Sequence, residues 1–368
     1  MEYSMTDLLQ RMLDLEGSDL HLAAHTRPIV RVHGELQPLD DLEPLTPAET
    51  KQLAYSVLTE KQKQRLEEAL EIDFSFGLKG LARFRGNIFH QRGSVGAVFR
   101  LIPMEIKSFD QLRLPAVVAK LCERPRGLIL VTGPTGSGKS TTLAAMLDRI
   151  NATRPHHILT IEDPIEFVHR NQKSLVNQRE IEADTHSFAN ALRVALRQDP
   201  DVVLIGEMRD LETIEAALRI AETGHLTFAT LHTNSAASTV NRIIDVFPAH
   251  QQAQIRTQLS LVLEGILSQA LLPKRGGGRV MAMEILIPNA AIRNLIREDK
   301  VHQIYSSMQT GQDKFGMVTF NQTLVQLVQS RQIETATALN ATSLPDELQE
   351  LLRRAQAAPA SAAGGMRH

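Results

Sequence analysis

One short motif constrains the fold of this chain more than any other feature. Residues 133–140 read Gly-Pro-Thr-Gly-Ser-Gly-Lys-Ser and satisfy the pattern G-x-x-x-x-G-K-[ST]. An apolar run at 128–131 precedes the motif, and a helical run at 141–147 follows it. This strand–loop–helix context predicts a P-loop nucleotide site rather than a glycine-rich turn that merely leads into a helix.

The motif predicts how nucleotide is held. Its glycines let backbone N–H groups curl around phosphates at a helix N-terminus, where the helix dipole also favours negative charge. Lys139 is expected to reach the β- and γ-phosphates, and Ser140 to ligate Mg²⁺, so ATP and Mg²⁺ are the predicted cofactors. The residues predicted to contact nucleotide are Gly133, Pro134, Thr135, Gly136, Ser137, Gly138, Lys139, Ser140 and Thr141.

Carboxylates follow two further apolar runs. The run at 202–205 ends in Gly206-Glu207, and Glu207 is predicted to hold the metal, directly or through water, although the common pattern has Asp there. Glu162 and Glu166 follow the run at 157–161, and from spacing alone either could activate the attacking water. The alternatives are a solvated carboxylate at 207 and an acidic surface loop at 162–166.

Two histidines flank the apolar run at 226–231. His225 and His232 are seven residues apart, which on one strand places them on opposite faces and about 23 Å apart. They therefore cannot both touch one nucleotide. His232, at the predicted C-terminal end of the strand, is the better γ-phosphate sensor, while His225 is expected to be structural or to act at a subunit boundary. Neither has a cysteine or carboxylate at zinc-ligand spacing beside it.

The hydrophobic pattern predicts two domains in a mixed α/β chain. Residues 1–100 combine a helix with two strand pairs, one of them turning near Gly34, as in a small α+β domain. Residues 101–114 are the predicted linker, and 115–354 alternate short buried strands with helices, as in a parallel α/β domain. The final residues, 355–368, have little to bury and are predicted to be disordered.

Arg83 and Arg85 stand out in the N-terminal domain. They share one face of a predicted strand with Asn87, while Phe84 and Ile88 occupy the other. Arginines offered to a nucleotide from another domain or subunit can raise the rate of phosphoryl transfer by roughly 10³ to 10⁵. The alternative is an ordinary exposed strand face.

Composition narrows the classes of partner. The 40 basic and 42 acidic residues give a net charge of −2, and there is no aromatic-rich basic stretch, which disfavours a nucleic-acid translocase. The acidic N-terminus and the absence of an apolar run of roughly 18 residues predict a cytoplasmic protein without direct membrane insertion. A single cysteine suits a reducing compartment and excludes a four-cysteine zinc module.

These motifs together resemble the type IV pilus retraction ATPases, the PilT-like members of the secretion-ATPase superfamily. The resemblance extends over nearly the whole chain up to the tail. It rests on the segments Gly17 to Leu22, Arg83 to Arg85, Val131 to Thr141, Ile161 to Glu166, Arg197 to Asp201, Gly206 to Asp210, Glu222 to His225 with His232, and Ala291 to Glu298. The last of these is the most discriminating, although its periodicity alone would indicate only an amphipathic surface helix.

The resemblance implies more than the residues themselves do. It implies a PAS-like N-terminal domain, a RecA-like ATPase domain, a ring-shaped homo-hexamer, and Arg83 and Arg85 acting across a subunit boundary. It also favours Glu166 as the water-activating carboxylate. The implied function is Mg²⁺-dependent ATP hydrolysis that powers pilus retraction and twitching motility, at an inner-membrane platform protein and with a paralogous retraction ATPase as a further partner. The alternatives are an accessory retraction ATPase, another secretion ATPase, or a nucleotide-gated adaptor with negligible turnover.

Overall fold

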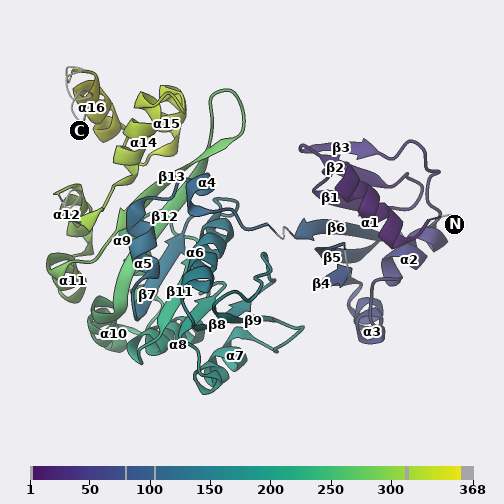
Figure 1. Ribbon diagram of the computed structural model, residues 1–368, viewed down its shortest axis with the longest axis horizontal. Coiled ribbons are helices and arrows are strands. Elements are labelled where there is room, and N and C mark those ends of the chain that lie inside the picture. Colours follow the sequence, from purple (N-terminus) through teal and green to yellow (C-terminus); the bar gives the residue numbers. More distant parts are fainter. Residues whose placement is uncertain (1–2, 79–80, 103–104, 311–314, 358–368) are drawn as a thin grey trace. The chain divides into compact units, whose positions relative to one another are not determined.

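The computed structural model describes residues 3–78, 81–102, 105–310 and 315–357, which fall into two units. One unit comprises the chain up to residue 106 together with residues 164–169, and the other comprises residues 107–163 and the chain from residue 170 onward. Each unit has its own sheet and its own hydrophobic core (Figure 1). The predicted mixed α/β character is confirmed.

The N-terminal unit contains a six-stranded antiparallel sheet in the order β3-β2-β1-β6-β5-β4. The predicted hairpin is confirmed, and its turn needs Gly34, whose φ is +92°. The elements of the unit are α1 (Met5–Asp14), β1 (Asp19–Leu22), β2 (Ile29–Val32), β3 (Glu35–Pro38), α2 (Pro47–Tyr55), α3 (Glu60–Ala69), β4 (Glu71–Leu78), β5 (Ala82–Gln91) and β6 (Ser94–Ile102).

Helix α1 shows how local sequence produces this unit. Ser4 and Asp7 form a capping box, so the first turn satisfies its free N–H groups. Leu8, Leu9 and Met12 recur at helical spacing and are fully buried in the core of the unit.

The C-terminal unit contains a seven-stranded sheet in the order β13-β12-β7-β11-β10-β8-β9. The four apolar runs predicted as strands are confirmed as β7, β8, β10 and β11, and all of them run parallel. The predicted parallel character holds for the strands from β12 to β9, and one antiparallel pair, β12 with β13, adds an edge strand that was not predicted. The strands are β7 (Gly127–Thr132), β8 (His157–Glu162), β9 (Leu175–Glu180), β10 (Val202–Ile205), β11 (Leu226–Leu231), β12 (Leu263–Pro273) and β13 (Arg279–Leu286).

Helices connect and cover these strands. In Figure 1, α14, α15 and α16 gather beside the β12–β13 pair and pack on it around a small separate core. The helices are α4 (Phe109–Leu112), α5 (Ala116–Cys122), α6 (Lys139–Thr153), α7 (Phe188–Ala195), α8 (Leu211–Glu222), α9 (Ala236–Asp245), α10 (Ala249–Val262), α11 (Ala290–Arg297), α12 (Ile304–Thr310), α14 (Phe320–Gln329), α15 (Thr335–Ala341) and α16 (Pro345–Ala357).

The predicted linker and tail overlap with regular structure. Leu101 and Ile102 are the last residues of β6, and α4 lies inside the predicted linker of residues 101–114. Residues 355–357 of the predicted tail belong to α16, and residues 358–368 lie outside the described part of the chain. Among the described residues, no helix combines the length and the apolar character that a membrane crossing requires.

Candidate functional site

The phosphate-binding loop lies between β7 and α6, as predicted. Every residue of β7 is buried, and α6 begins at Lys139, directly after the loop. Gly133, Gly136 and Gly138 have φ values of 141°, 78° and 88°, a region that only glycine enters without strain. A side chain at Gly133 would also collide with the backbone oxygen of Gln269. The motif glycines are therefore dictated by backbone shape as well as by the need for access to N–H groups.

Lys139 lies against its own loop. Its ammonium donates hydrogen bonds to the carbonyl oxygens of Gly133 at 2.8 Å and Pro134 at 3.1 Å. This places a positive charge at the helix N-terminus, where the helix dipole already favours an anion. The local chemistry suits a polyphosphate.

The order of the strands brings further side chains to the same edge of the sheet. The P-loop follows β7, His232 follows β11, Glu207 follows β10, and Glu162 ends β8. These strands are neighbours in the order β7-β11-β10-β8 and run parallel, so their carboxyl ends meet at one edge. Adjacent strands are about 4.8 Å apart, so β7 and β10 are separated by roughly 10 Å. This is the edge where α/β sheets bind ligands.

Glu207 is the centre of a charged cluster. Its carboxylate lies 3.1 Å from Nε2 of His232 and accepts a hydrogen bond of 2.8 Å from the guanidinium of Arg209. Burial tends to raise the pKa of Glu207, but the hydrogen bond and charge of Arg209, together with His232, outweigh it and lower the pKa. Glu207 is therefore a carboxylate at neutral pH, and it can orient His232 or serve as an oxygen ligand to a hard cation.

The two candidates for water activation lie in different surroundings. Glu162 accepts hydrogen bonds from the hydroxyl of Thr160 at 2.6 Å and the amide of Gln178 at 3.1 Å, so its carboxylate is held within the edge of the sheet. Glu166 lies in the segment 164–169, which groups with the N-terminal unit. The catalytic role of Glu166 stays a prediction.

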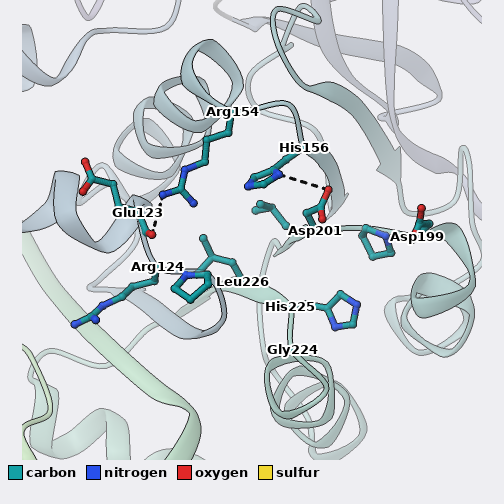
Figure 2. A pocket seen from close by; sticks show the side chains of 12 residues that line it. Glu123, Arg124, Arg154, His156, Asp199, Asp201, Gly224, His225 and Leu226 are labelled. Atoms are coloured by element: carbon teal, nitrogen blue, oxygen red, sulfur yellow. Dashed lines mark hydrogen bonds and ion pairs between the residues drawn. The ribbon is translucent and has the colours of Figure 1, made fainter.

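His225 lies at the amino end of the central strand β11, opposite the carboxyl ends where the P-loop lies. It precedes β11, whereas His232 follows it, so neither histidine is part of the strand itself. Its Nδ1 is 3.1 Å from the carbonyl oxygen of Ile220, a contact within its own turn. Figure 2 shows it beside a cavity of about 550 Å³, into which the His156–Asp201 pair projects. This cavity lies at the amino ends of the parallel strands and is separate from the P-loop edge.

Arg83 and Arg85 both lie on β5, on the face predicted for them. Phe84 and Ile88 are fully buried on the other face. Arg83 donates to the hydroxyl of Ser75 at 3.2 Å, and Arg85 lies 3.8 Å from the carboxylate of Asp73. Both arginines thus contact β4 of their own sheet, and a role at a nucleotide stays a prediction.

Sequence reasoning missed two residues of the site. Ser268 and Gln269 are buried in β12, next to β7, and contact the two ends of the P-loop region. The hydroxyls of Ser268 and Thr132 are 2.8 Å apart, and the Gln269 amide donates to the Ser137 carbonyl at 2.7 Å. The only sequence signal was a pair of polar residues inside an apolar run, which is not specific.

The residues fit the predicted nucleotide and metal. The hydroxyl of Ser137 is buried in the loop without a hydrogen-bond partner among the described residues, which leaves it free to donate to a phosphate oxygen. The Ser140 hydroxyl and the Glu207 carboxylate offer the oxygen ligands that Mg²⁺ prefers. The described residues contain no cluster of three or more histidine, cysteine, aspartate or glutamate side chains suited to a metal.

The segment 291–298 forms an amphipathic helix, as predicted. Ile292 and Ile296 of α11 are fully buried against the main core. Arg293 contacts the protein as well, because its guanidinium bonds the Ser260 carbonyl at 2.7 Å and the Glu264 carboxylate at 2.9 Å. Arg297, in contrast, is exposed.

Comparison with known proteins gives consistent results. Residues 98–353 match a protein family described as type II/IV secretion system protein. The chain is 53% identical over 93% of its length to a Pseudomonas aeruginosa protein named type IV pilus retraction ATPase PilT, covering 99% of it. It is 52% identical over 89% of its length to a Neisseria gonorrhoeae twitching motility protein, covering 87% of it. A crystal structure titled pilus retraction motor PilT and bound ADP superposes with a TM-score of 0.91 at 56% identity, over 95% of this chain and 100% of that one.

Proposed function

The chain belongs to the type II/IV secretion system protein family and, within it, to the pilus retraction ATPases, and from this we propose that it hydrolyses ATP to power retraction of a type IV pilus. One observation carries this proposal at the level of chemistry. The P-loop, His232 and Glu207 follow three neighbouring parallel strands at one edge of the sheet. That edge offers a phosphate cradle together with a carboxylate–histidine pair that can respond to a γ-phosphate.

Each residue has a task in this reaction. The loop from Gly133 to Thr141 binds the phosphates, and the Lys139 ammonium exchanges its loop carbonyls for phosphate oxygens. Ser140 and Glu207 would hold Mg²⁺ or its waters, and the bound metal would supply positive charge that offsets the charge of the phosphates. His232 senses the γ-phosphate through its contact with Glu207.

The water-activating group and the arginines complete the proposal. Glu166 accepts the proton of the attacking water. Glu162, at the end of β8, orders the chain before Glu166 through its hydrogen bonds with Thr160 and Gln178. Arg83 and Arg85 reach a nucleotide across a subunit boundary in a ring of six copies. The resemblance to retraction ATPases supports these roles, as it supports a PAS-like fold for the N-terminal unit and a RecA-like fold for the C-terminal unit.

The ring is proposed to work at the cytoplasmic side of the inner membrane, on the platform protein of the pilus machinery. A paralogous retraction ATPase is the second partner that the family supports. Nucleic acid is not proposed as a partner, because the net charge of −2 supplies no excess positive charge for a phosphate backbone.

Purified protein tests the chemistry directly. We expect Mg²⁺-dependent ATP hydrolysis that Lys139→Ala and Glu166→Gln both abolish, while Glu215→Gln, which changes an exposed carboxylate on α8, leaves turnover unchanged. Intact turnover in Lys139→Ala would refute the nucleotide site.

A second experiment tests the function in the host. Deletion of the gene should give surplus surface pili and no surface motility. Cells without pili would instead indicate a role in pilus extension.

A further inference from the structure

Gln269 lies on β12 where this strand passes the start of the P-loop. In the pairing of β12 with β7, Ser268 is opposite Thr132, the last residue before the loop, and their hydroxyl oxygens are 2.8 Å apart. Gln269 follows directly and is only 3% exposed. Strand β12 is thus fixed against β7 at the point where the chain leaves the sheet to form the loop.

Both ends of the loop lie against this one residue. At the first end, a Cβ added to Gly133 would collide with the backbone oxygen of Gln269. At the second end, a Cβ added to Gly138 would lie 3.2 Å from the side-chain nitrogen of Gln269, and that nitrogen donates to the Ser137 carbonyl at 2.7 Å. A single buried residue therefore lies against both ends of the loop, with its backbone oxygen at the start and its side-chain amide where the loop passes into α6.

The hydrogen bond to Ser137 fixes a peptide plane. In a trans peptide the C=O and the following N–H point in opposite directions. Because the Ser137 carbonyl is held toward Gln269, the N–H of Gly138 points away from β12. N–H groups at this position of a P-loop bind phosphate, so the direction of this plane decides whether one of the donors is available.

Two polar atoms beside this bond are buried and lack partners among the described residues. They are the side-chain oxygen of Gln269 and the hydroxyl of Ser137. Buried polar atoms in native proteins nearly always have partners, so two unpaired atoms beside the loop leave room for a hydrogen bond to a ligand or a water.

We propose that Gln269 is a positioning residue of the nucleotide site, which holds the Ser137–Gly138 peptide in the orientation that binds phosphate. This inference rests on the proposed ATPase function and adds to it a residue outside the P-loop motif. Gln269 acts through the loop backbone and on nucleotide affinity rather than on the chemical step.

Gln269→Met tests the proposal in the full-length protein, because methionine has a similar length and no hydrogen-bond donor. We expect the dissociation constant for a fluorescent ADP analogue with Mg²⁺ to rise about tenfold or more, equivalent to about 1.4 kcal/mol. The KM for ATP should rise with it, while kcat changes by less. Gln269→Glu keeps the shape of the side chain but removes the amide donor, and it should also weaken binding. This second variant keeps the proposal testable if the methionine variant folds poorly.

Asn321→Leu is the matched control. Asn321 is 1% exposed on α14 and also donates a side-chain amide to a backbone carbonyl, that of Leu344 at 3.1 Å. Its loss should lower the melting temperature and leave nucleotide affinity unchanged. Affinity within about twofold of wild type in both Gln269 variants, or an equal loss of affinity in Asn321→Leu, would overturn the proposal. If Lys139→Ala also failed to weaken binding, the nucleotide site itself would be refuted.

Discussion

At the scale of single residues, the charge of Glu207 is central to the site. Glu207→Gln keeps the shape but removes the partner of His232 and Arg209. Because the carboxylate is proposed to hold the metal, we expect kcat to fall by on the order of 10²-fold while ADP affinity stays close to wild type. Steady-state ATPase assays and nucleotide titration measure the two effects. An unchanged kcat would remove Glu207 from the catalytic set.

The pKa of Glu207 also has a consequence for stability. Its pKa is lower in the folded protein than in the unfolded chain, so the carboxylate stabilises the fold above the unfolded pKa of about 4.3. This contribution disappears as the pH falls through the folded pKa. Urea unfolding at pH 7 and at pH 4 should therefore show a smaller acid-induced loss of stability in Glu207→Gln than in wild type. An equal loss in both proteins would contradict the assignment.

The single cysteine gives a probe of the main core. Cys122 on α5 is buried, and burial raises the pKa of its thiol to about 12. Only the thiolate reacts with disulfide reagents. At pH 8 the native protein should therefore resist a thiol reagent that modifies the same protein at once in guanidinium chloride. Fast labelling of native protein would show that the α5 region opens readily.

At the scale of elements, the two arginines of α11, Arg293 and Arg297, differ in how much they contact the rest of the protein. Arg293 bonds two carbonyl groups and Glu264 and is half-buried, whereas Arg297 is exposed and donates to the Asn294 side chain at 3.3 Å. Arg293→Ala should lower the free energy of unfolding by about 1–3 kcal/mol. Arg297→Ala should change it by less than about 0.5 kcal/mol.

The two arginines allow a test of whether the exposed side of α11 contacts a partner during retraction. We expect Arg297→Ala to keep its ATPase activity and to abolish retraction, because the exposed arginine is free to contact a partner. Chemical denaturation, ATPase assays and a twitching assay in the host separate the effects. Normal twitching in Arg297→Ala, or lost ATPase activity without loss of stability, would show that α11 is not a partner surface.

The elements also show what sequence could predict. The strands β7, β8, β10 and β11 are short apolar runs, each with a clear helix after or before it. The hydrophobic pattern of the sequence was therefore enough to predict them. Strand β9 reads Leu-Val-Asn-Gln-Arg-Glu and lies at an edge of the sheet, so it carries no apolar signal. Helix α10 ends at Val262 and β12 starts at Leu263 with no glycine or proline between them, so no local signal marks the change.

The presence or absence of a local sequence signal also explains which parts of the site were predicted. The P-loop has a fixed motif, and Glu207 and His232 follow recognisable strands, so sequence could place them at one edge. Gln269 contacts the loop across 132 positions of sequence, through a strand that pattern did not find. A contact of this range depends on the order of strands in the sheet, which a hydrophobic pattern does not specify.

At the scale of the whole molecule, the chain consists of two units with separate cores, and the proposed motor needs both. The P-loop, Glu207 and His232 belong to one unit, whereas Arg83 and Arg85 belong to the other. If the arginines act on the nucleotide of a neighbouring copy, no isolated chain contains a complete site. ATPase activity per subunit should therefore fall steeply on dilution below the concentration at which the ring assembles.

Mixing two inactive variants tests this arrangement most directly. Arg85→Ala lacks the arginine but keeps Glu207, and Glu207→Gln lacks the carboxylate but keeps Arg85. In rings assembled from equal amounts of both, about a quarter of the subunit boundaries combine an intact Glu207 with an intact neighbouring Arg85. Activity should therefore return toward a quarter of wild type if the sites fire independently. No recovery in rings that light scattering shows to be mixed would place Arg85 outside the neighbour's site, and its contact with Asp73 would then be its whole role.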